Sequence, residues 1–193
     1  MNQAIRGPDG QLRCRWCLSA PQFLDYHDSE WGFPVDDDCR LFEKLSLEAF
    51  QSGLSWRTIL AKRDNFRRAF CDFDPVRIAR FDGTDVERLL GDRGIVRHRG
   101  KIEATIGNAR AYLEIGGGEA FSTQMWAYVD GAPLVNRFQS LADVPASTPL
   151  SERISKDLRK AGFRFVGPTI VYAWMQACGL VNDHIVGCPA RRV

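Results

Sequence analysis

Two helical patterns meet at Gly162-Phe163-Arg164-Phe165-Val166-Gly167-Pro168-Thr169, a short segment bounded by glycines. Before it, Ser151 is predicted to cap a helix that carries Ile154 and Leu158 on its inner side. After it, Pro168 is predicted to open a second helix, because proline is favoured at the first helical position. The order of helix, short hairpin and helix is therefore the main signal for the fold.

The hairpin has the features of a phosphate-binding element. Gly167 lets the backbone approach another molecule closely, and free amides near Thr169 can bind a phosphate without reading a base. Arg164 and Lys160 add positive charge at the same place. A plain connection between two helices is the alternative, and the flanking basic residues favour DNA.

Helical signals dominate the rest of the chain, and strand signals are nearly absent, so the predicted fold class is all-α. Predicted helix starts are Asp36-Asp37-Asp38, Ser55, Asp74-Pro75 and the capping box Thr84-Asp85-Val86-Glu87, and a helix through Ile102 and Leu113 is predicted to end at Gly116-Gly117-Gly118. Residues 133–149 are predicted to form a loop with at most a short helical turn.

Length and composition predict one α-helical domain over residues 1–193, with residues 1–12 as a flexible N-terminal extension. The first eight residues lack the apolar core of a signal peptide, and no run approaches the length that spans a bilayer. We therefore expect a cytoplasmic protein with no membrane partner. Its remaining cysteines are expected to be free thiols: Cys17, Cys39, Cys71 and Cys178.

The net charge of +2 is unevenly distributed. Five Arg or Lys residues oppose one Glu between Arg93 and Arg110, and seven oppose three acidic residues from Pro149 to the end. Acidic residues gather earlier, at Asp36-Asp37-Asp38. This asymmetry suits a protein with one face toward a polyanion, although a solvated basic helix face explains it nearly as well.

Two Cys/His pairs near opposite ends of the chain have spacings suited to one metal ion. Cys14 precedes His27 near the start, and His184 lies four residues before Cys188 near the end. Two thiolates and two imidazoles are a common tetrahedral zinc set, and such a site would be structural because no position remains for substrate. Ordinary buried thiols and histidines are the alternative, and the spacing Cys14-x-x-Cys17 makes Cys17 a rival ligand.

Aromatic residues crowd into the same N-terminal stretch: Trp16, Phe23, Tyr26 and Trp31. Each of them taken singly is explained by packing in the core. Together, beside a metal, they can form a slot for a planar heterocycle, with cation–π attraction if the guest is positively charged.

An apolar helix end carries a single carboxylate, Glu48, ahead of a break at Gly53. Its apolar neighbours predict partial burial, and a buried carboxylate needs a partner that the donors of a bound base would provide. A surface glutamate is the alternative. The turn at Gly53 and Leu54 is predicted to bind DNA, with Leu54 as an apolar wedge in the gap left by an extruded nucleotide.

Several longer motifs, in collinear order from about Cys14 to Cys188, resemble those of 3-methyladenine DNA glycosylase I of bacteria, a family of the helix-hairpin-helix superfamily. They are Tyr26-His27-Asp28-Ser29-Glu30-Trp31-Gly32, Gly53-Leu54-Ser55-Trp56, Gly94-Ile95-Val96-Arg97-His98-Arg99-Gly100-Lys101-Ile102, Ile106-Gly107-Asn108-Ala109-Arg110-Ala111-Tyr112, Gly162-Phe163-Arg164-Phe165-Val166-Gly167 and Val181-Asn182-Asp183-His184.

The resemblance implies an all-α helix-hairpin-helix glycosylase fold with a zinc clasp joining the two ends of the chain. It implies one structural Zn²⁺ on Cys14, His27, His184 and Cys188, which makes Cys17 the outsider. It also implies that Glu48 binds the base, that Trp56 stacks on it, and that Trp16 and Tyr26 form further pocket walls. Phe23 stands where some relatives have a tyrosine, so stacking is expected there without a hydroxyl hydrogen bond.

The activity implied is hydrolytic excision of 3-methyladenine from alkylated double-stranded DNA of any sequence, leaving an abasic site without strand cleavage. The expected protein is a monomer of the bacterial cytoplasm that joins the nucleoid during repair. Asp183 is expected to orient His184 rather than to catalyse. The competing functions are a zinc-stabilised helical DNA-binding module without catalysis and a glycosylase for a different modified base.

Overall fold

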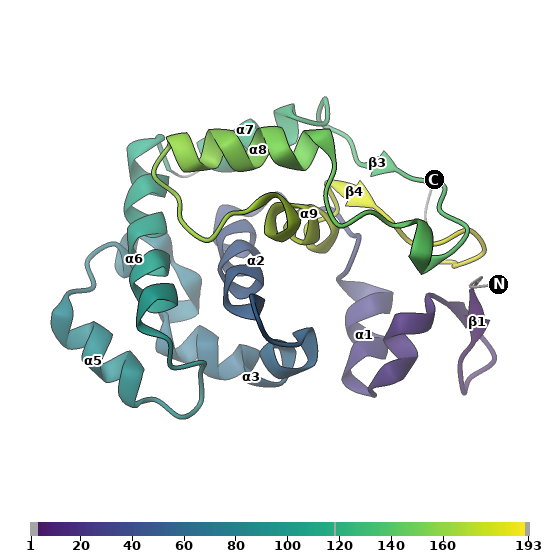
Figure 1. Cartoon of the computed structure of the whole chain (residues 1–193), viewed down its shortest axis with the longest axis horizontal. Coiled ribbons are helices and arrows are strands. Elements are labelled where there is room, and N and C mark those ends of the chain that lie inside the picture. Colours follow the sequence, from purple (N-terminus) through teal and green to yellow (C-terminus); the bar gives the residue numbers. More distant parts are fainter. Residues whose placement is uncertain (1–3, 118, 192–193) are drawn as a thin grey trace.

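The computed structural model describes residues 4–117 and 119–191, and this part of the chain is mostly helical (Figure 1). The helices are η1 (Arg15–Ser19), α1 (Gln22–Ser29), α2 (Asp38–Gln51), α3 (Trp56–Ala69), η2 (Cys71–Phe73), α4 (Pro75–Ile78), α5 (Gly83–Gly91), α6 (Arg99–Glu114), α7 (Glu119–Ala127), η3 (Leu141–Asp143), α8 (Pro149–Lys160) and α9 (Pro168–Ala177). The strands are β1 (Ile5–Arg6), β2 (Leu12–Arg13), β3 (Leu134–Val135) and β4 (Val181–Asn182).

Helix α2 lies in the middle of the molecule, with α9 and α3 packed against it (Figure 1). It begins where predicted, because the Asp37 side chain accepts a hydrogen bond from the Arg40 amide at 2.8 Å. Phe42 and Phe50 of α2 are fully buried, as is Trp174 of α9. Burial of such side chains contributes about 1.5–3 kcal/mol each, so the helix that carries Glu48 is firmly held.

The predicted succession of helix, short connection and helix is present as α8, residues 161–167 and α9. Gly162 terminates the first helix with a φ of +96°, a conformation that glycine adopts without strain. Helix α8 begins earlier than the sequence predicts, since Thr148 is its N-cap and Ser151 is the third residue of a capping box. The reason is Pro149, which takes the first helical position and moves the cap to the residue before it.

A second predicted cap is also displaced. Helix α5 is capped by Asp82, whose carboxylate accepts from the amides of Thr84 and Asp85, so the expected cap at Thr84 is wrong. Asp85 completes the capping box through the Asp82 amide.

The N-terminal strands and the segment after β4 lie on the same side of the molecule as α1 (Figure 1). β1 pairs with β2 in an antiparallel hairpin, so residues 5–12, expected in a flexible extension, form local structure. The segment 133–149, expected to be a loop with at most a short helical turn, contains the short helical turn η3 and also the strand β3, which was not expected and pairs in parallel with β4. None of the described helices is both long and apolar enough to cross a membrane.

Candidate active site and metal centre

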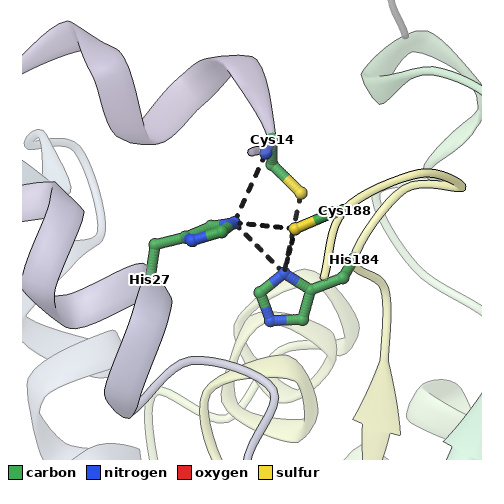
Figure 2. Close-up of side chains that lie close together, drawn as sticks. All are labelled: Cys14, His27, His184 and Cys188. Carbon is green, nitrogen blue, oxygen red and sulfur yellow. Dashed lines mark hydrogen bonds between the residues drawn. The ribbon is translucent and has the colours of Figure 1, made fainter. Parts of the chain in front are cut away.

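The four predicted metal ligands lie together where the two ends of the chain meet (Figure 2). Cys14 precedes η1, His27 lies in α1, and His184 and Cys188 follow β4. All four residues are buried, and their ligand atoms lie within 4.8 Å of one another. Cys17 is buried in a separate apolar cluster with Ala20 and so is not among these ligands.

The ligand atoms lie close to one another. His27 Nε2 lies 3.2 Å from His184 Nδ1 and 3.5 Å from Cys188 Sγ, and His184 Nδ1 lies 3.6 Å from both sulfurs. Hydrogen bonds from Cys14 and the two imidazoles lower the pKa of the Cys188 thiol, which favours a thiolate in the cluster. The set can hold a four-coordinate cation.

Outer hydrogen bonds fix which nitrogen each imidazole turns inward. His27 Nδ1 contacts Asp28 Oδ1 at 2.7 Å, and Arg13 holds that carboxylate from the other side. His184 Nε2 contacts the carbonyl oxygen of Trp31 at 2.8 Å. Such partners orient the ligands of metal sites.

The expectation that Asp183 orients His184 is wrong. The fully buried Asp183 carboxylate instead accepts hydrogen bonds from Asn136, Tyr172 and Gln176 at 2.5 to 2.8 Å. Three donors satisfy this carboxylate in the interior, which also leaves it unsuited to act on a substrate.

Beside the cluster lies a cavity of 320 Å³. Its walls include five predicted pocket residues, and they are Trp16, Tyr26, Trp31, Glu48 and Trp56. Trp16 meets Trp31 edge to face at 5.2 Å, and Tyr26 is tilted against Trp56 at 5.3 Å between ring centroids. The imidazole of His184 packs on Trp31 at 4.7 Å, and that of His27 packs on Trp16 at 5.4 Å. The metal cluster thus supports two walls of the cavity.

Phe23 does not line this cavity, contrary to expectation. It lies behind Trp16, whose ring it meets edge to face at 5.8 Å, and packs in the small core with Cys17. On α1, Tyr26 lines the cavity and His27 belongs to the ligand cluster, whereas Phe23 lies one turn earlier against η1.

Glu48 is the acidic residue of the cavity wall, and its side chain is almost fully buried. Burial raises the pKa of Glu48 to about 8, while the positive charge of Lys44 opposes the shift. Within the described part of the chain, the Glu48 carboxylate accepts no hydrogen bond, and the buried Nε1 of Trp56 likewise finds no acceptor. The cavity therefore offers the acceptor oxygens of Glu48 to a guest.

A second hollow of 450 Å³ continues from this cavity, sharing Glu48, Gln51 and Ala173 with it. Four of the five residues predicted to bind DNA line it, namely Gly53, Leu54, Gly167 and Thr169. The fifth, Arg164, lines an adjoining hollow of 410 Å³ at the hairpin, together with Gly167. Leu54 is 45% exposed. The turn after α2 and the hairpin before α9 therefore flank the entrance to the cavity.

The family model described as methyladenine glycosylase matches residues 16–192. The chain belongs to this family. It is 53% identical over 177 residues to DNA-3-methyladenine glycosylase 1 of Escherichia coli strain K12, covering 91% of this chain and 95% of the relative.

Solved structures give the same result. A crystal structure of 3-methyladenine DNA glycosylase I matches with a TM-score of 0.88 and 52% identity, covering 92% of this chain and 98% of the other. A structure of the Staphylococcus aureus enzyme, described as showing the basis of 3-methyladenine recognition, matches with a TM-score of 0.89 and 37% identity over 94% of this chain and 97% of the other.

The sequence did not point to the other wall residues of the cavity, which are Gln51, Leu141, Val144, Ala173 and Gln176. Gln51 follows Glu48 by three residues, so helical spacing was a usable signal. The side chain of Gln176 is held by a hydrogen bond that its Nε2 donates to Asp183 at 2.8 Å. The side-chain oxygen of Gln176 is left as a further acceptor. No local pattern marks Gln176, because the contact that turns it depends on the folded chain.

Proposed function

We propose that this chain is a DNA glycosylase that excises 3-methyladenine from alkylated DNA by hydrolysis and leaves an abasic site. The observation that carries the proposal is the buried, unpartnered Glu48 in an aromatic-walled cavity, in a chain of the methyladenine glycosylase family. The test is incubation with methylated DNA and chromatography of the released bases. Free 3-methyladenine is the expected product.

The same experiment separates the alternatives. A non-catalytic DNA-binding module would retain methylated DNA and release no base, and a glycosylase for another lesion would release a different base. The cavity argues against the first alternative, because binding duplex DNA needs no slot for an extruded base.

Selection of the lesion follows from charge and shape. Methylation at N3 makes the adenine nucleoside cationic, and the Glu48 carboxylate can accept from its exocyclic amine. Trp56, Tyr26 and Trp16 can stack on or surround the ring, which favours a cationic guest. An uncharged adenine gains less from the same contacts.

The chemical step demands little of the protein. Water adds to the sugar carbon, the bond from that carbon to the base nitrogen breaks, and its electron pair leaves with the base, which becomes neutral. A proton from the water passes to solvent. Glu48 is the catalytic candidate, because an ionised carboxylate in the cavity stabilises the positive charge of base and sugar.

The pH dependence of excision should report the ionisation of Glu48. Since burial raises the pKa of Glu48 to about 8, the charged form increases as the pH rises from 6 to 8. We expect kcat/KM to rise up to about tenfold per pH unit in this range and to level off above it. Single-turnover excision across the range measures it, and a flat profile in the wild type would contradict the assignment.

We infer that α8, the hairpin and α9 form a helix-hairpin-helix element that holds double-stranded DNA without reading its sequence. Gly167 is the N-cap residue of α9, and no side chain caps the backbone amides at this N-terminus. Arg164 is exposed and lines the same hollow as Gly167. Amides and guanidinium groups bind phosphates, which carry no base identity. Leu54, across the entrance, would fill the gap left by the extruded nucleotide.

Arg164→Ala should reduce the slope of log affinity against log salt by about one, because one phosphate contact is lost. Arg77→Ala removes the same charge from an exposed position on α4 and serves as the control. Affinity for an undamaged duplex, titrated at several salt concentrations, is the measurement. If the slope of log affinity against log salt were equal in both variants, the hairpin would not be part of the DNA interface.

We propose that the metal cluster binds one structural Zn²⁺ and acts as a clasp between the chain ends. Tetrahedral zinc, with bonds of about 2.0–2.1 Å to nitrogen and 2.3 Å to sulfur, separates its ligand atoms by about 3.3–3.8 Å. Four of the six separations, from 3.2 to 3.6 Å, are close to these values, and all six are within 4.8 Å. Four protein ligands leave no position for substrate, so bound zinc would supply rigidity rather than chemistry. We further propose a monomer that works on the nucleoid in the bacterial cytoplasm.

A further inference from the structure

Lys101 is a buried cation that the proposed reaction does not use. It lies in the first turn of α6 and is only 7% exposed. Its ammonium donates to the carbonyl oxygen of Phe50 at 3.0 Å and to that of Ser52 at 2.5 Å. These carbonyls belong to the end of α2 and the turn after it, so a side chain from a distant part of the sequence holds the turn that presents Leu54.

The turn Gln51-Ser52-Gly53-Leu54 has the geometry of a type II turn. Ser52 has φ −48° and ψ 117°, Gly53 has φ +77°, and the Leu54 amide donates to the Gln51 carbonyl at 2.6 Å. Types I and II differ mainly by a flip of the central peptide, whose carbonyl here is that of Ser52. Because Lys101 binds this carbonyl, it favours one orientation of the peptide over the other.

Helix α6 also holds the hairpin on the other side of the entrance. The Asn108 side chain accepts from the Arg164 amide at 2.7 Å and donates to the Arg164 carbonyl at 3.0 Å. The imidazole of His98, which caps α6, meets the ring of Phe165 edge to face at 6.4 Å. One helix therefore fixes both DNA-facing segments.

We infer that Lys101 is a positioning residue that locks the type II turn, so that Leu54 is aimed into the duplex when the lesion leaves the stack. The inference rests on the proposed glycosylase function. It predicts a defect that grows with the cost of extruding the base, because a wedge matters most where the base pair is intact. If Lys101 only satisfied the carbonyl groups at the end of α2, the loss of excision in its variants would not depend on how costly the base is to extrude.

The test compares Lys101→Met with Lys62→Met. Lys62 is a matched control, since its ammonium also donates to two backbone carbonyls, those of Arg93 and Gly94, at 2.9 and 3.2 Å, away from this turn. The substrate is a methylated oligonucleotide with a single adenine, annealed with thymine or with a mispairing cytosine opposite it. We expect Lys101→Met to lower kcat/KM about tenfold or more on the paired lesion and less than threefold on the mispaired one. Its affinity for free 3-methyladenine should equal that of the wild type.

Leu54→Ala completes the test as a double-mutant cycle. If Lys101 acts through Leu54, Leu54→Ala lowers paired-lesion excision in the wild type and adds little to Lys101→Met. Three results would overturn the inference. They are an equal loss of kcat/KM on both duplexes, an equal loss of kcat/KM in Lys62→Met, and additive losses in the double variant. Should Lys101→Met fail to fold, Lys101→Arg, which keeps the charge but not the compact ammonium, takes its place. A wild type that releases no base would instead refute the proposed function.

Discussion

Glu48→Gln is expected to lower kcat/KM for excision of 3-methyladenine about 10- to 100-fold. Glutamine keeps the shape and one acceptor oxygen, so the variant isolates the negative charge. A hydrogen bond to a charged group is worth about 1.5–3 kcal/mol, and loss of that range corresponds to the expected decrease. Single-turnover excision from methylated DNA at pH 8.5, where most of the wild-type carboxylate is ionised, gives the largest contrast.

The control for this variant is Glu114→Gln, which removes the same charge from an exposed position at the end of α6. Zinc content and affinity for undamaged duplex should be unchanged in both variants, since within the described residues no hydrogen bond or ion pair joins Glu48 to the ligand cluster or to the hairpin. The pH dependence of excision should disappear in Glu48→Gln alone. A variant with the wild-type rate would place the carboxylate outside the recognition step and would contradict the account of selectivity.

Much of the helical framework is predictable from local signals. Asp37, Ser55 and Asp74 cap helices where the sequence predicts caps, because each accepts a hydrogen bond from an amide two or three residues later. The displaced caps at Thr148 and Asp82 have local causes as well. In both cases several residues with capping side chains lie close together, and the neighbouring backbone decides which of them is used.

Prediction of the site succeeds where chemistry restricts the choice and fails where packing decides. The small number of histidines and the Cys/His spacings identify the candidate metal ligands, while the choice of Cys14 over Cys17 comes from the family resemblance. Phe23 and Tyr26 lie one turn apart on α1, yet only Tyr26 reaches the cavity, since Trp16 of η1 covers Phe23. The orientation of the Gln176 side chain depends on its hydrogen bond to Asp183, and that of Lys101 depends on its hydrogen bond to the end of α2. Such contacts between distant segments leave no local pattern.

Cys188→Ser is expected to remove the metal and to lower the free energy of unfolding by about 3 kcal/mol or more, because structural zinc binding contributes directly to folding. For a chain of this length, that corresponds to a fall in Tm of about 6–12 °C. Since the His184 and His27 rings support Trp31 and Trp16, excision should also decline. Metal analysis of the purified protein and thermal unfolding followed by circular dichroism are the measurements.

Cys17→Ser is the matched control, because Cys17 and Cys14 are both fully buried and lie three residues apart, yet only Cys14 joins the ligand cluster. A hydroxyl in place of either thiol carries a comparable cost of burying a polar group, so this cost largely cancels in the comparison. Cys14→Ser should therefore lose zinc as Cys188→Ser does, whereas Cys17→Ser should keep about one zinc per chain. If Cys17→Ser emptied the site and Cys14→Ser did not, the clasp would be held by Cys17, and the assignment of Cys14 as a ligand would be wrong.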